Sequence, residues 1–589
     1  MAAVESATVQ RSFGCNAILL LVVLLLVSTI SGTEIASADS QGHKGSNASN
    51  GWTNIPTLGE LQKRNALGTS LEIIEVTKPI KRPATESCTI TLVPRTEFPP
   101  SPYTGLYYNN YTGSFTAPNA TECGEDWSLV VLDWDASSQG RQYDRFSGLW
   151  LGRAELLRTS TAEPTVNGIH WHIEKDVTKL SALFKSDHDV FMELDNSIGG
   201  VLSGIFTVEV TLTFYRATNE TDAQELPDVV LPIANKEPGH GYWFVLNGGS
   251  NGTGNFENLP QNIYRAELEI IASPHLCEEF WYTDPPTGVT TDFGCKSLGA
   301  FHEVRAFVDG VIAGAAWPTP VVFTGGFDPY LWHPVVGTGA FLGPSYTLDL
   351  TPFVGQLVDG KRHSIAIDVA GDTSYWLVDA NLLLWLDPDS NQTSGGVLKH
   401  KIETDVVPLA SGYDESAKRH DYVSGYVASS KGNLTTVISR SFDFSNSQEY
   451  VNFGAQPQIV GWKQLTHVKS KVSTKASGAN NALYEFETEE TTPFSGQFNP
   501  YTGGVTLSKV NRLRTKLKRG DDPEMDSYLV NVQTATDPAF GAATAHVVQQ
   551  YSVAGGDECY QRMLTTAFGA IATDVESTEG CPQVGAEVV

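Results

Sequence analysis

The sequence of 589 residues has few basic side chains: 39 Lys and Arg stand against 67 Asp and Glu, which gives a formal net charge of −28. Such a charge repels both the phosphate backbone of nucleic acids and anionic membrane surfaces, so neither is expected as a partner. Long helical patterns are nearly absent. No repeat of fixed period stands out either, which disfavours a propeller or a solenoid.

Several catalytic and metal-binding motifs are missing. The sequence has no HExxH, no GxxxxGK[ST] phosphate loop and no CxxC, so a zinc peptidase of that type, a P-loop nucleotide site and a structural zinc site are disfavoured. His170 and His172 alternate on one face of a predicted strand, where they could share a metal or be ordinary sheet residues. We expect the second, and predict neither a metal nor an organic cofactor.

One long apolar run is present, at residues 17–30, and it follows Arg11. It is short for crossing a hydrocarbon layer of roughly 30 Å and typical of the core of a signal peptide. Ala36 and Ala38 then form a small-x-small cleavage site. We therefore predict a signal peptide at residues 1–38, with an uncleaved signal anchor as the alternative. The mature chain is expected in the extracellular space or in an endomembrane or vacuolar lumen, without stable membrane association.

Cysteines and glycosylation sequons agree with export. Six cysteines remain after the predicted cleavage, an even number that suits disulfides in an oxidising compartment. The simplest pairing follows sequence order: Cys88 with Cys123, Cys277 with Cys295, and Cys559 with Cys581. The predicted glycosylation sites are the asparagines of seven Asn-x-Ser/Thr sequons: Asn47, Asn110, Asn119, Asn219, Asn251, Asn391 and Asn433.

Short runs of β-branched and aromatic residues, separated by Gly, Pro, Asn and Asp, dominate the chain and predict antiparallel sandwiches. In residues 205–215, apolar side chains from Phe206 to Phe214 alternate with polar ones, which places the apolar set on one side of a strand. Two short helical patterns stand at 151–157 and 177–183, and the second is interpreted as one or two helical turns that join strands. Runs read as strands are 127–134, 205–215, 264–272, 304–311 and 381–386.

Turn-rich stretches suggest the domain boundaries. Residues 39–59 are interpreted as a flexible tether, because their Gly, Ser and Asn residues bury little apolar area. A first β domain is predicted at 60–235 and a second at 236–389, ending at the solvated sequence DPDSNQTSGG. Residues 390–589 are predicted to be a further β-rich domain, and their sequence indicates no particular function.

Two patches place carboxylates beside aromatic rings. In GRQYDRFSGLWL, Asp144 and Arg145 stand between Tyr143 and an aromatic residue at the start of a predicted strand. An Asp beside an Arg can be a structural ion pair or part of a site. In CEEFWY, Glu278 and Glu279 precede three aromatic residues. Neighbouring residues of a strand point to opposite faces, so at most one of these glutamates is expected to line a given cleft.

Long segments resemble the peptide-N-glycanase A family, the plant and fungal peptide-N4-(N-acetyl-β-glucosaminyl)asparagine amidases. The similar segments cover roughly residues 70–390 in order, with weaker likeness beyond. They are RQYDRFSGLWLGRAELLRTSTAEPTVNGIHWHIEKDVTKL, YRAELEIIASPHLCEEFWYTDPP, HEVRAFVDGVIAGAAWPTPVVFTGGFDPYLWHPVVGTGAF, SYTLDLTPFVG and SYWLVDANLLLWLD.

The resemblance implies two eight-stranded jelly rolls side by side with the active site at their interface, as in the distantly related bacterial glycoamidase. It also implies hydrolysis of the amide that joins an N-glycan to asparagine in glycopeptides or unfolded glycoproteins. Asp144 and Arg145 match the catalytic aromatic-Asp-Arg motif. Glu278 or Glu279 resembles the second carboxylate, with Glu303 kept as a third option because residues 283–299 interrupt the likeness.

A mechanism follows from the resemblance. Asp144 orients or activates water while it contacts the first N-acetylglucosamine, Arg145 supplies positive charge, and Glu279 holds the water or the carbonyl. Tyr143 is expected to contact substrate. Activity is expected at mildly acidic pH. The larger rings that could stack on sugars, or be core residues instead, are Trp150, Trp281 and Trp332.

Two other functions fit the same residues. A secreted β-sandwich lectin would keep the sugar site without turnover, and a glycosidase would cut between the two core sugars. The sequence leaves open whether core-fucosylated glycans are accepted, and whether the chain is processed into subunits.

Overall fold

The structure is a computed structural model that describes residues 70–99, 110–218, 225–239, 241–286, 299–371, 375–453, 456–479, 481–520, 522–541, 544–556 and 558–581. These residues belong to one compact unit. The predicted signal peptide and tether, Cys295, Asn47 and Asn219 lie outside the described residues. Among the described helices, none has the length and apolar character that a membrane span requires.

The first nine strands form two sheets that share one apolar core, as the sequence predicts. One sheet has the order β1-β7-β4-β9-β2 and the other β3-β8-β5-β6. In β9 the apolar residues Phe206, Val208 and Val210 are buried, which confirms the predicted alternation. The strands are β1 Leu71–Ile73, β2 Ser87–Phe98, β3 Asn110–Phe115, β4 Trp127–Gln139, β5 Phe146–Leu151, β6 Ala154–Ser160, β7 Ile169–Asp176, β8 His188–Leu194 and β9 Ile205–Arg216.

One short helical pattern of this region is wrong and the other is right. Residues 151–157 end β5 and begin β6, because Gly152 and Arg153 form a tight turn with positive φ angles of 54° and 72°. The segment 177–183 does form the expected helical turns between strands. The helices of this region are α3 Ala120–Cys123, η3 Thr178–Leu180 and η4 Leu183–Lys185.

A second pair of sheets follows, with the orders β10-β18-β13-β16 and β12-β17-β14-β15, while β11 also pairs with β18. The run 304–311 is not one strand, because Asp309 and Gly310 both have positive φ and turn the chain into a hairpin of β14 and β15. The strands are β10 Val229–Ile233, β11 Phe244–Leu246, β12 Asn251–Phe256, β13 Ile263–Pro274, β14 Glu303–Val308, β15 Val311–Ala316, β16 Ser345–Asp349, β17 His363–Ala370 and β18 Trp376–Leu386. The helices are η5 Leu276–Glu278, η6 Trp281–Thr283, η7 Pro329–Trp332, η8 Thr351–Phe353 and α4 Val354–Leu357.

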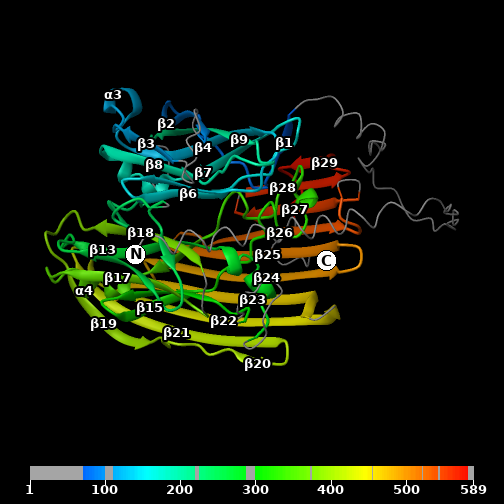
Figure 1. The fold of residues 1–589 in the computed structure, drawn as a ribbon. Coiled ribbons are helices and arrows are strands. Elements are labelled where there is room, and N and C mark those ends of the chain that lie inside the picture. Colours follow the sequence, from blue (N-terminus) through cyan, green and yellow to red (C-terminus); the bar gives the residue numbers. More distant parts are fainter. Residues whose placement is uncertain are drawn as a thin grey trace, which may run out of the picture. The chain divides into compact units, whose positions relative to one another are not determined.

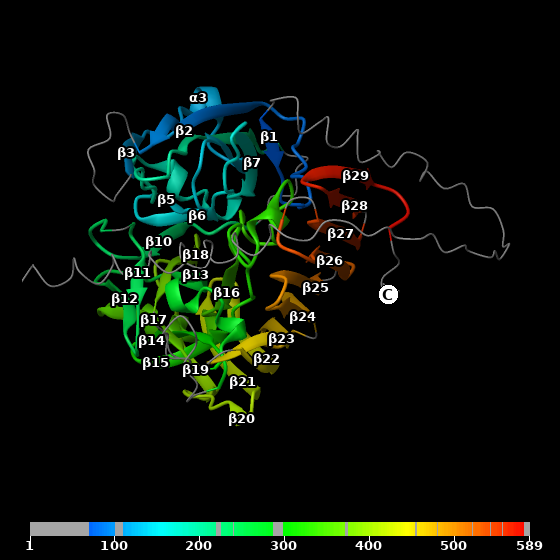
Figure 2. The same cartoon turned by 45° about the vertical axis from the view of Figure 1, so that its right-hand side comes forward.

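In both sandwiches, early and late strands interleave within each sheet, an arrangement that fits the predicted jelly rolls. Figures 1 and 2 show the first sandwich in blue and cyan and the second largely in green. β10 pairs with β18 across residues 229–233, so the second pair of sheets includes residues before 235. β18 ends at Leu386 and β19 begins at Ser394, and the predicted domain boundaries stay predictions.

The C-terminal region is a single eleven-stranded sheet in which consecutive strands pair from β21 to β29, with β19 and β20 beside β21. Its β-rich character was predicted, but its strands of up to 22 residues were not. The strands are β19 Ser394–Lys401, β20 Leu409–Ser411, β21 Asp414–Ser429, β22 Gly432–Phe453, β23 Gln456–Ala476, β24 Tyr484–Asn499, β25 Gly504–Arg519, β26 Met525–Asp537, β27 His546–Gly555, β28 Glu558–Ala567 and β29 Ala570–Ser577.

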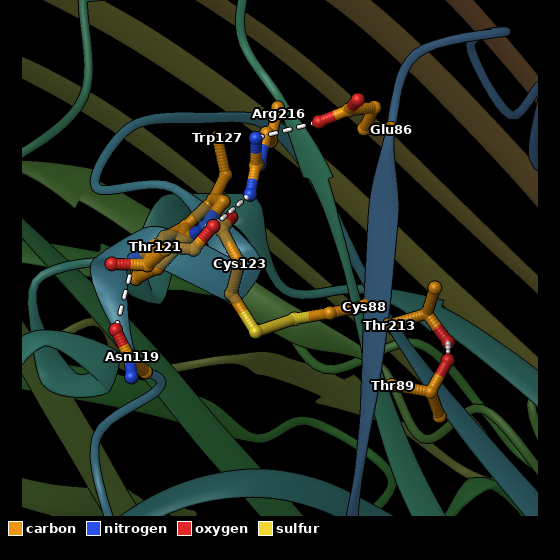
Figure 3. Close-up of a disulfide and its surroundings, with 9 residues drawn as sticks. All are labelled: Glu86, Cys88, Thr89, Asn119, Thr121, Cys123, Trp127, Thr213 and Arg216. Atoms are coloured by element: carbon orange, nitrogen blue, oxygen red, sulfur yellow. Dashed lines mark hydrogen bonds and ion pairs between the residues drawn. A yellow bond between two sulfur atoms is a disulfide. The ribbon is translucent and has the colours of Figure 1, made fainter.

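Two predicted disulfides are present, Cys88–Cys123 and Cys559–Cys581. The first ties α3 to β2, and Figure 3 shows it beside the ion pair of Arg216 with Glu86. Cys277 is disulfide-bonded as well. The asparagines of five sequons lie within the described residues and are exposed, although their glycosylation stays a prediction; they are Asn110, Asn119, Asn251, Asn391 and Asn433.

Candidate active site

Four segments from the two sandwiches meet at one place. Asp144 lies in the turn before β5, and Glu163 follows β6 in the first sandwich. From the second sandwich come Glu279, between η5 and η6, and Gly325, in the connection from β15 to β16. Three carboxylates are thereby gathered at the junction of the sandwiches, where the resemblance places the active site.

Asp144 receives a hydrogen bond across this junction. The backbone N–H of Gly325 donates to its carboxylate. Burial raises the pKa of Asp144, while the Gly325 N–H and the positive charge of Arg145 act in the opposite direction. The site therefore contains groups that favour the charged form of this one carboxyl, although burial disfavours it.

Glu279 lies close enough to Asp144 to sense its charge. Burial raises the pKa of Glu279 to about 7, and the negative charge of Asp144 adds to the effect. Among the described residues no favourable partner counteracts this shift, so at mildly acidic pH Glu279 holds a proton. Glu279 of the second sandwich therefore lies near Asp144 of the first, and the catalytic role of the two stays a prediction.

Glu163 is a third member that the sequence analysis did not single out. Burial and then the charge of Asp144 raise its pKa to about 8, although the backbone N–H of Asp144 donates to the Glu163 carboxylate and acts in the opposite direction. This glutamate stands in the sequence TAEPT, without an aromatic neighbour and remote from CEEFWY. Only its position in a family-like segment could have pointed to it.

The other two candidate glutamates face elsewhere. Glu278 is buried, and its Oε2 lies 2.9 Å from Nε2 of His302 and 3.4 Å from the indole nitrogen of Trp376. Glu303 is fully buried and is ion-paired with Arg419 at 3.0 Å. Neither is therefore placed as the second carboxylate of this site.

Glu278 and Glu279 point in different directions for a reason other than strand alternation. The two residues do not lie on a strand. Glu278 ends the 3-10 turn η5, and Glu279 follows it with helical φ and ψ of −54° and −38°. Successive side chains of a 3-10 helix differ in direction by about 120°. Glu278 therefore points into the protein, whereas Glu279 points toward Asp144.

Arg145 is held near the cluster without a direct ion pair to Asp144 among the contacts of the described residues. Its Nη2 donates to Oε1 of Gln142 at 2.5 Å and to the hydroxyl of Ser197 at 3.4 Å. Burial lowers the pKa of Arg145, while the charges of Asp195 and Asp144 counteract that shift. The guanidinium thus acts on Asp144 through its charge, and the alternative of a simple structural ion pair is not supported.

The three predicted sugar-stacking tryptophans are core residues, so that prediction is wrong. Trp150 is 0% exposed and donates through its indole nitrogen to Asp379 at 3.0 Å. Trp281 and Trp332 are each 2% exposed. Their large apolar area is buried in packing, which was the alternative for each. Tyr143, by contrast, is 44% exposed directly beside Asp144.

A small crevice with a cavity volume of about 20 Å³ lies between the sandwiches. Its walls include Phe146 and Arg158 from the first sandwich and Phe323 and Pro274 from the second. Phe146 is two residues from Asp144 in the chain, and Phe323 is two residues from Gly325. The crevice lining contains none of the three carboxylates, so the charged cluster lies beside it.

One group outside this cluster has the geometry to hold a metal ion within the described part of the chain. Asp133, His172 and Glu174 offer ligand atoms within 4.8 Å of one another. Arg82 already pairs with Asp133 at 2.9 Å and with Glu174 at 2.7 Å. Hydrogen bonds to Asp133 and Asp135 raise the pKa of His172 to about 9, although burial acts in the opposite direction. His172 is therefore expected to be a protonated imidazole, which cannot bind a metal ion.

Fold and site together define the class: an all-β protein with a cluster of partly buried carboxylates and an arginine where two sandwiches meet. The chain belongs to the family described as peptide N-acetyl-beta-D-glucosaminyl asparaginase amidase A, whose model matches residues 80–403. It is 37% identical over 531 residues to "Peptide-N4-(N-acetyl-beta-glucosaminyl)asparagine amidase A" of Prunus dulcis, covering 85% of this chain and 91% of that relative.

Solved structures give a weaker likeness. PNGase F, a glycosylasparaginase from Flavobacterium meningosepticum, is 12% identical with a TM-score of 0.33, covering 51% of this chain and 96% of that chain. PNGF-II is 12% identical with a TM-score of 0.34, covering 52% of this chain and 66% of that chain. Likeness at this level transfers no residue roles to the present chain.

Proposed function

We propose that this chain is a glycoamidase that hydrolyses the side-chain amide of glycosylated asparagine in N-glycopeptides or unfolded glycoproteins. The observation that carries the proposal is the cluster of Asp144, Glu163 and Glu279 at the sandwich junction, in a member of this family. The products are an aspartate-containing peptide and a glycosylamine, which then loses ammonia spontaneously.

The environments of the three carboxyls divide the chemical work. Asp144 has an N–H donor and a nearby guanidinium, which support its anionic form. Glu279 and Glu163, with pKa values of about 7 and 8, are protonated at mildly acidic pH. Groups whose environments separate their pKa values in this way suit a base and an acid in one reaction.

The reaction balances with these roles. Water loses a proton to Asp144 as its oxygen bonds to the carbonyl carbon of the substrate amide. The bond between that carbon and the glycosylated nitrogen breaks, and the nitrogen takes a proton from Glu279 or Glu163. Arg145 adds positive charge near the developing oxyanion. Tyr143, exposed beside Asp144, contacts the sugar or peptide of the bound substrate.

The decisive experiment is incubation of the purified protein with a defined N-glycopeptide, followed by mass spectrometry. An amidase releases the whole glycan and leaves a peptide about one mass unit heavier than its asparagine form, because amide is exchanged for carboxylate. A glycosidase leaves one sugar on the peptide, and a lectin binds without any mass change. Either of those results would refute the proposal.

We also propose that the chain acts after export, in an extracellular or lumenal compartment. Two disulfides and a third bonded cysteine support this, since disulfides persist in oxidising compartments. Five exposed sequon asparagines point the same way. Enzymatic deglycosylation of the protein purified from plant or fungal secretory expression should lower its mass at these positions, and an unchanged mass would contradict the proposal.

A further inference from the structure

Three polar side chains of the C-terminal sheet bind three consecutive carbonyls of the second sandwich. In β22, Asn446, Gln448 and Tyr450 alternate with exposed residues and therefore share the inner face of the sheet. Asn446 Nδ2 donates to the carbonyl of Tyr282 at 2.9 Å. The hydroxyl of Tyr450 donates to Thr283 O at 3.2 Å, and Gln448 Nε2 donates to Asp284 O at 2.7 Å. We call Asn446, Gln448 and Tyr450 the β22 ladder.

The ladder is also bonded within itself and to the next strand. Gln448 Nε2 donates to Asn446 Oδ1 at 2.9 Å, and the single proton of the Tyr450 hydroxyl is shared between Thr283 O and Gln448 Oε1, which lies 2.8 Å away. Asn446 Nδ2 further donates to Gln464 Oε1 at 3.1 Å on β23. Asn446, Gln448 and Gln464 are buried. Interlinked buried amides hold one arrangement firmly, because any change leaves polar groups unpaired.

Aromatic contacts from the same sheet reach the other half of the site. Trp462 on β23 stacks on Phe327 with ring centroids 5.1 Å apart and an angle of 13°. Phe494 on β24 meets Tyr282 edge-on at 4.8 Å. Phe327 is two residues beyond Gly325, whose N–H binds Asp144. The C-terminal sheet therefore contacts both segments that the second sandwich contributes to the carboxylate cluster.

The three carbonyls bound by the β22 ladder follow Glu279 closely in the chain. Glu279 follows η5 directly, and η6 begins two residues later and ends at Thr283. The carbonyls at the end of a helical turn have no partner within that turn, and here the β22 ladder supplies their donors. The path of the chain just after Glu279 is thus fixed by side chains that lie more than 160 residues further along.

We propose that the β22 ladder and Trp462 are positioning residues. They hold Glu279, and the turn that contains Gly325 (the Gly325 turn), in place next to Asp144, so that the C-terminal sheet is part of the catalytic apparatus. This inference rests on the proposed glycoamidase function. It assigns a role to residues 390–589, for which the sequence alone indicated none. A misplacement of a reacting group by about 1 Å can cost roughly 10²-fold in rate, so modest loosening of η6 is enough to lower turnover.

The test is a set of variants assayed with a defined N-glycopeptide. Tyr450→Phe removes one hydroxyl, and the triple variant Asn446→Leu, Gln448→Met, Tyr450→Phe removes the ladder donors while keeping size. We expect kcat to fall about 3-fold in the first and roughly 10²-fold in the second, with KM changed little. The high-pH limb of the kcat profile should also shift, because the pKa of Glu279 depends on its burial and on its distance from Asp144.

Asn531→Leu is the matched control. Asn531 is also buried on the same sheet, and its Oδ1 accepts from Gln549 at 3.2 Å, on a part of the sheet away from η6. This variant should lose thermal stability with kcat and pH profile intact. When Asn446 and Gln448 are restored in the triple variant, most of kcat should return, and the high-pH limb of the kcat profile should move back to its wild-type position. A general loss of stability would not give this pattern.

The outcomes separate the two proposals. If the wild-type protein fails to hydrolyse the glycopeptide, the proposed function is refuted, whatever the variants do. If the wild type is active and Tyr450→Phe and the folded ladder variants keep its kcat and pH limb, the positioning role is refuted. Should the triple variant not fold, the single variants Tyr450→Phe and Gln448→Met decide in the same way.

Discussion

Gly325 donates its backbone N–H to the carboxylate of Asp144, although the two residues belong to different sandwiches. The approach is so close that a β-carbon on Gly325 would stand 2.4 Å from Oδ1 of Asp144. Only glycine leaves room for this contact. The Asp144 carboxylate, which we propose as the catalytic base, is therefore oriented by the backbone of the other sandwich.

Gly325→Ala should consequently impair catalysis more than stability. The added methyl group must displace Asp144 from the N–H and from its place beside Glu279, and we expect kcat/KM for a glycopeptide to fall by about 10²-fold. Gly239→Ala is the control, because a β-carbon there meets no atom within 4 Å. Unchanged kinetics in Gly325→Ala would mean that this contact does not orient the catalytic group.

Asp144→Asn should abolish most hydrolysis while leaving binding intact. The amide keeps the shape of the side chain but cannot take a proton from water, and loss of a general base costs typically 10²–10⁴-fold in kcat. Binding of a glycopeptide, measured by calorimetry, should stay within a few fold of wild type. Asp126→Asn, at an exposed ion pair with Lys185, serves as the control and should be fully active.

The two neighbouring glutamates should behave differently when changed to glutamine. Glu279→Gln removes a proton donor beside Asp144, so kcat should fall by roughly 10²-fold with the melting temperature nearly unchanged. Glu278→Gln instead breaks the buried contact with His302 and should lower the melting temperature while most of kcat remains. The reverse pattern would assign the second carboxylate to Glu278.

The pH dependence of turnover should follow the raised carboxyl pKa values. Glu279 and Glu163 donate a proton only below their pKa values of about 7 and 8. As pH rises through that range the protonated fraction falls, so kcat should decline above about pH 7. Profiles of kcat between pH 4 and 9 check this, and Glu279→Gln should lack the limb near 7. A rate that keeps rising to pH 9 would contradict the assignment of donors.

The sequence predicted what depends on local pattern and on family-like strings. The alternation in residues 205–215 determines which face of β9 is buried, and sequence order was enough to pair Cys88 with Cys123. Asp144 was identified because its aromatic-Asp-Arg motif is contiguous in the chain. The structure adds that the three carboxylates come together from segments up to 135 residues apart, which no local pattern encodes.

The failures have physical reasons too. A tryptophan beside a motif can serve a sugar or a core equally well, and only the packing around Trp150, Trp281 and Trp332 decides between them. Glu163 has an ordinary sequence context, and its raised pKa arises from burial and from Asp144 across the fold. The β22 ladder was hidden for the same reason, because its partners are backbone carbonyls, which carry no sequence signal.

Arg158→Met should destabilise the junction between the sandwiches. Its guanidinium binds both oxygens of Glu155, at 2.8 and 2.5 Å, and also contacts Ser273, Leu377 O and Asp379. All of these groups are buried, so removing the cation leaves two carboxyls without their partner, which costs roughly 3–5 kcal/mol. Urea unfolding checks this. Lys185→Met, at an exposed pair, should change stability little.

Asp328→Asn should stabilise the protein increasingly as pH rises. Asp328 is fully buried in the connection that carries Gly325 and is hydrogen-bonded to Asp537 of the C-terminal sheet. Burial and then the hydrogen bond with Asp537 raise the pKa of Asp328 to about 7. The folded state therefore keeps a proton that the unfolded chain releases near its ordinary pKa of 3.8. Stability contributed by this proton is complete below about pH 4 and is lost as pH rises through 7.

Asparagine at this position donates to Asp537 at any pH and can still accept the N–H of Tyr330, which Asp328 Oδ1 accepts at 2.9 Å. The difference in melting temperature between variant and wild type should hence grow from pH 4 to pH 7 and then level off. Glu163, Glu279 and Asp284, whose pKa values are also raised, are present in both proteins and cancel from the difference. A difference that does not vary with pH would show that Asp328 and Asp537 do not share a proton. In that case the contact between the C-terminal sheet and the connection that carries Gly325 would rest on ring contacts such as Phe327 with Trp462 and Tyr330 with Phe540.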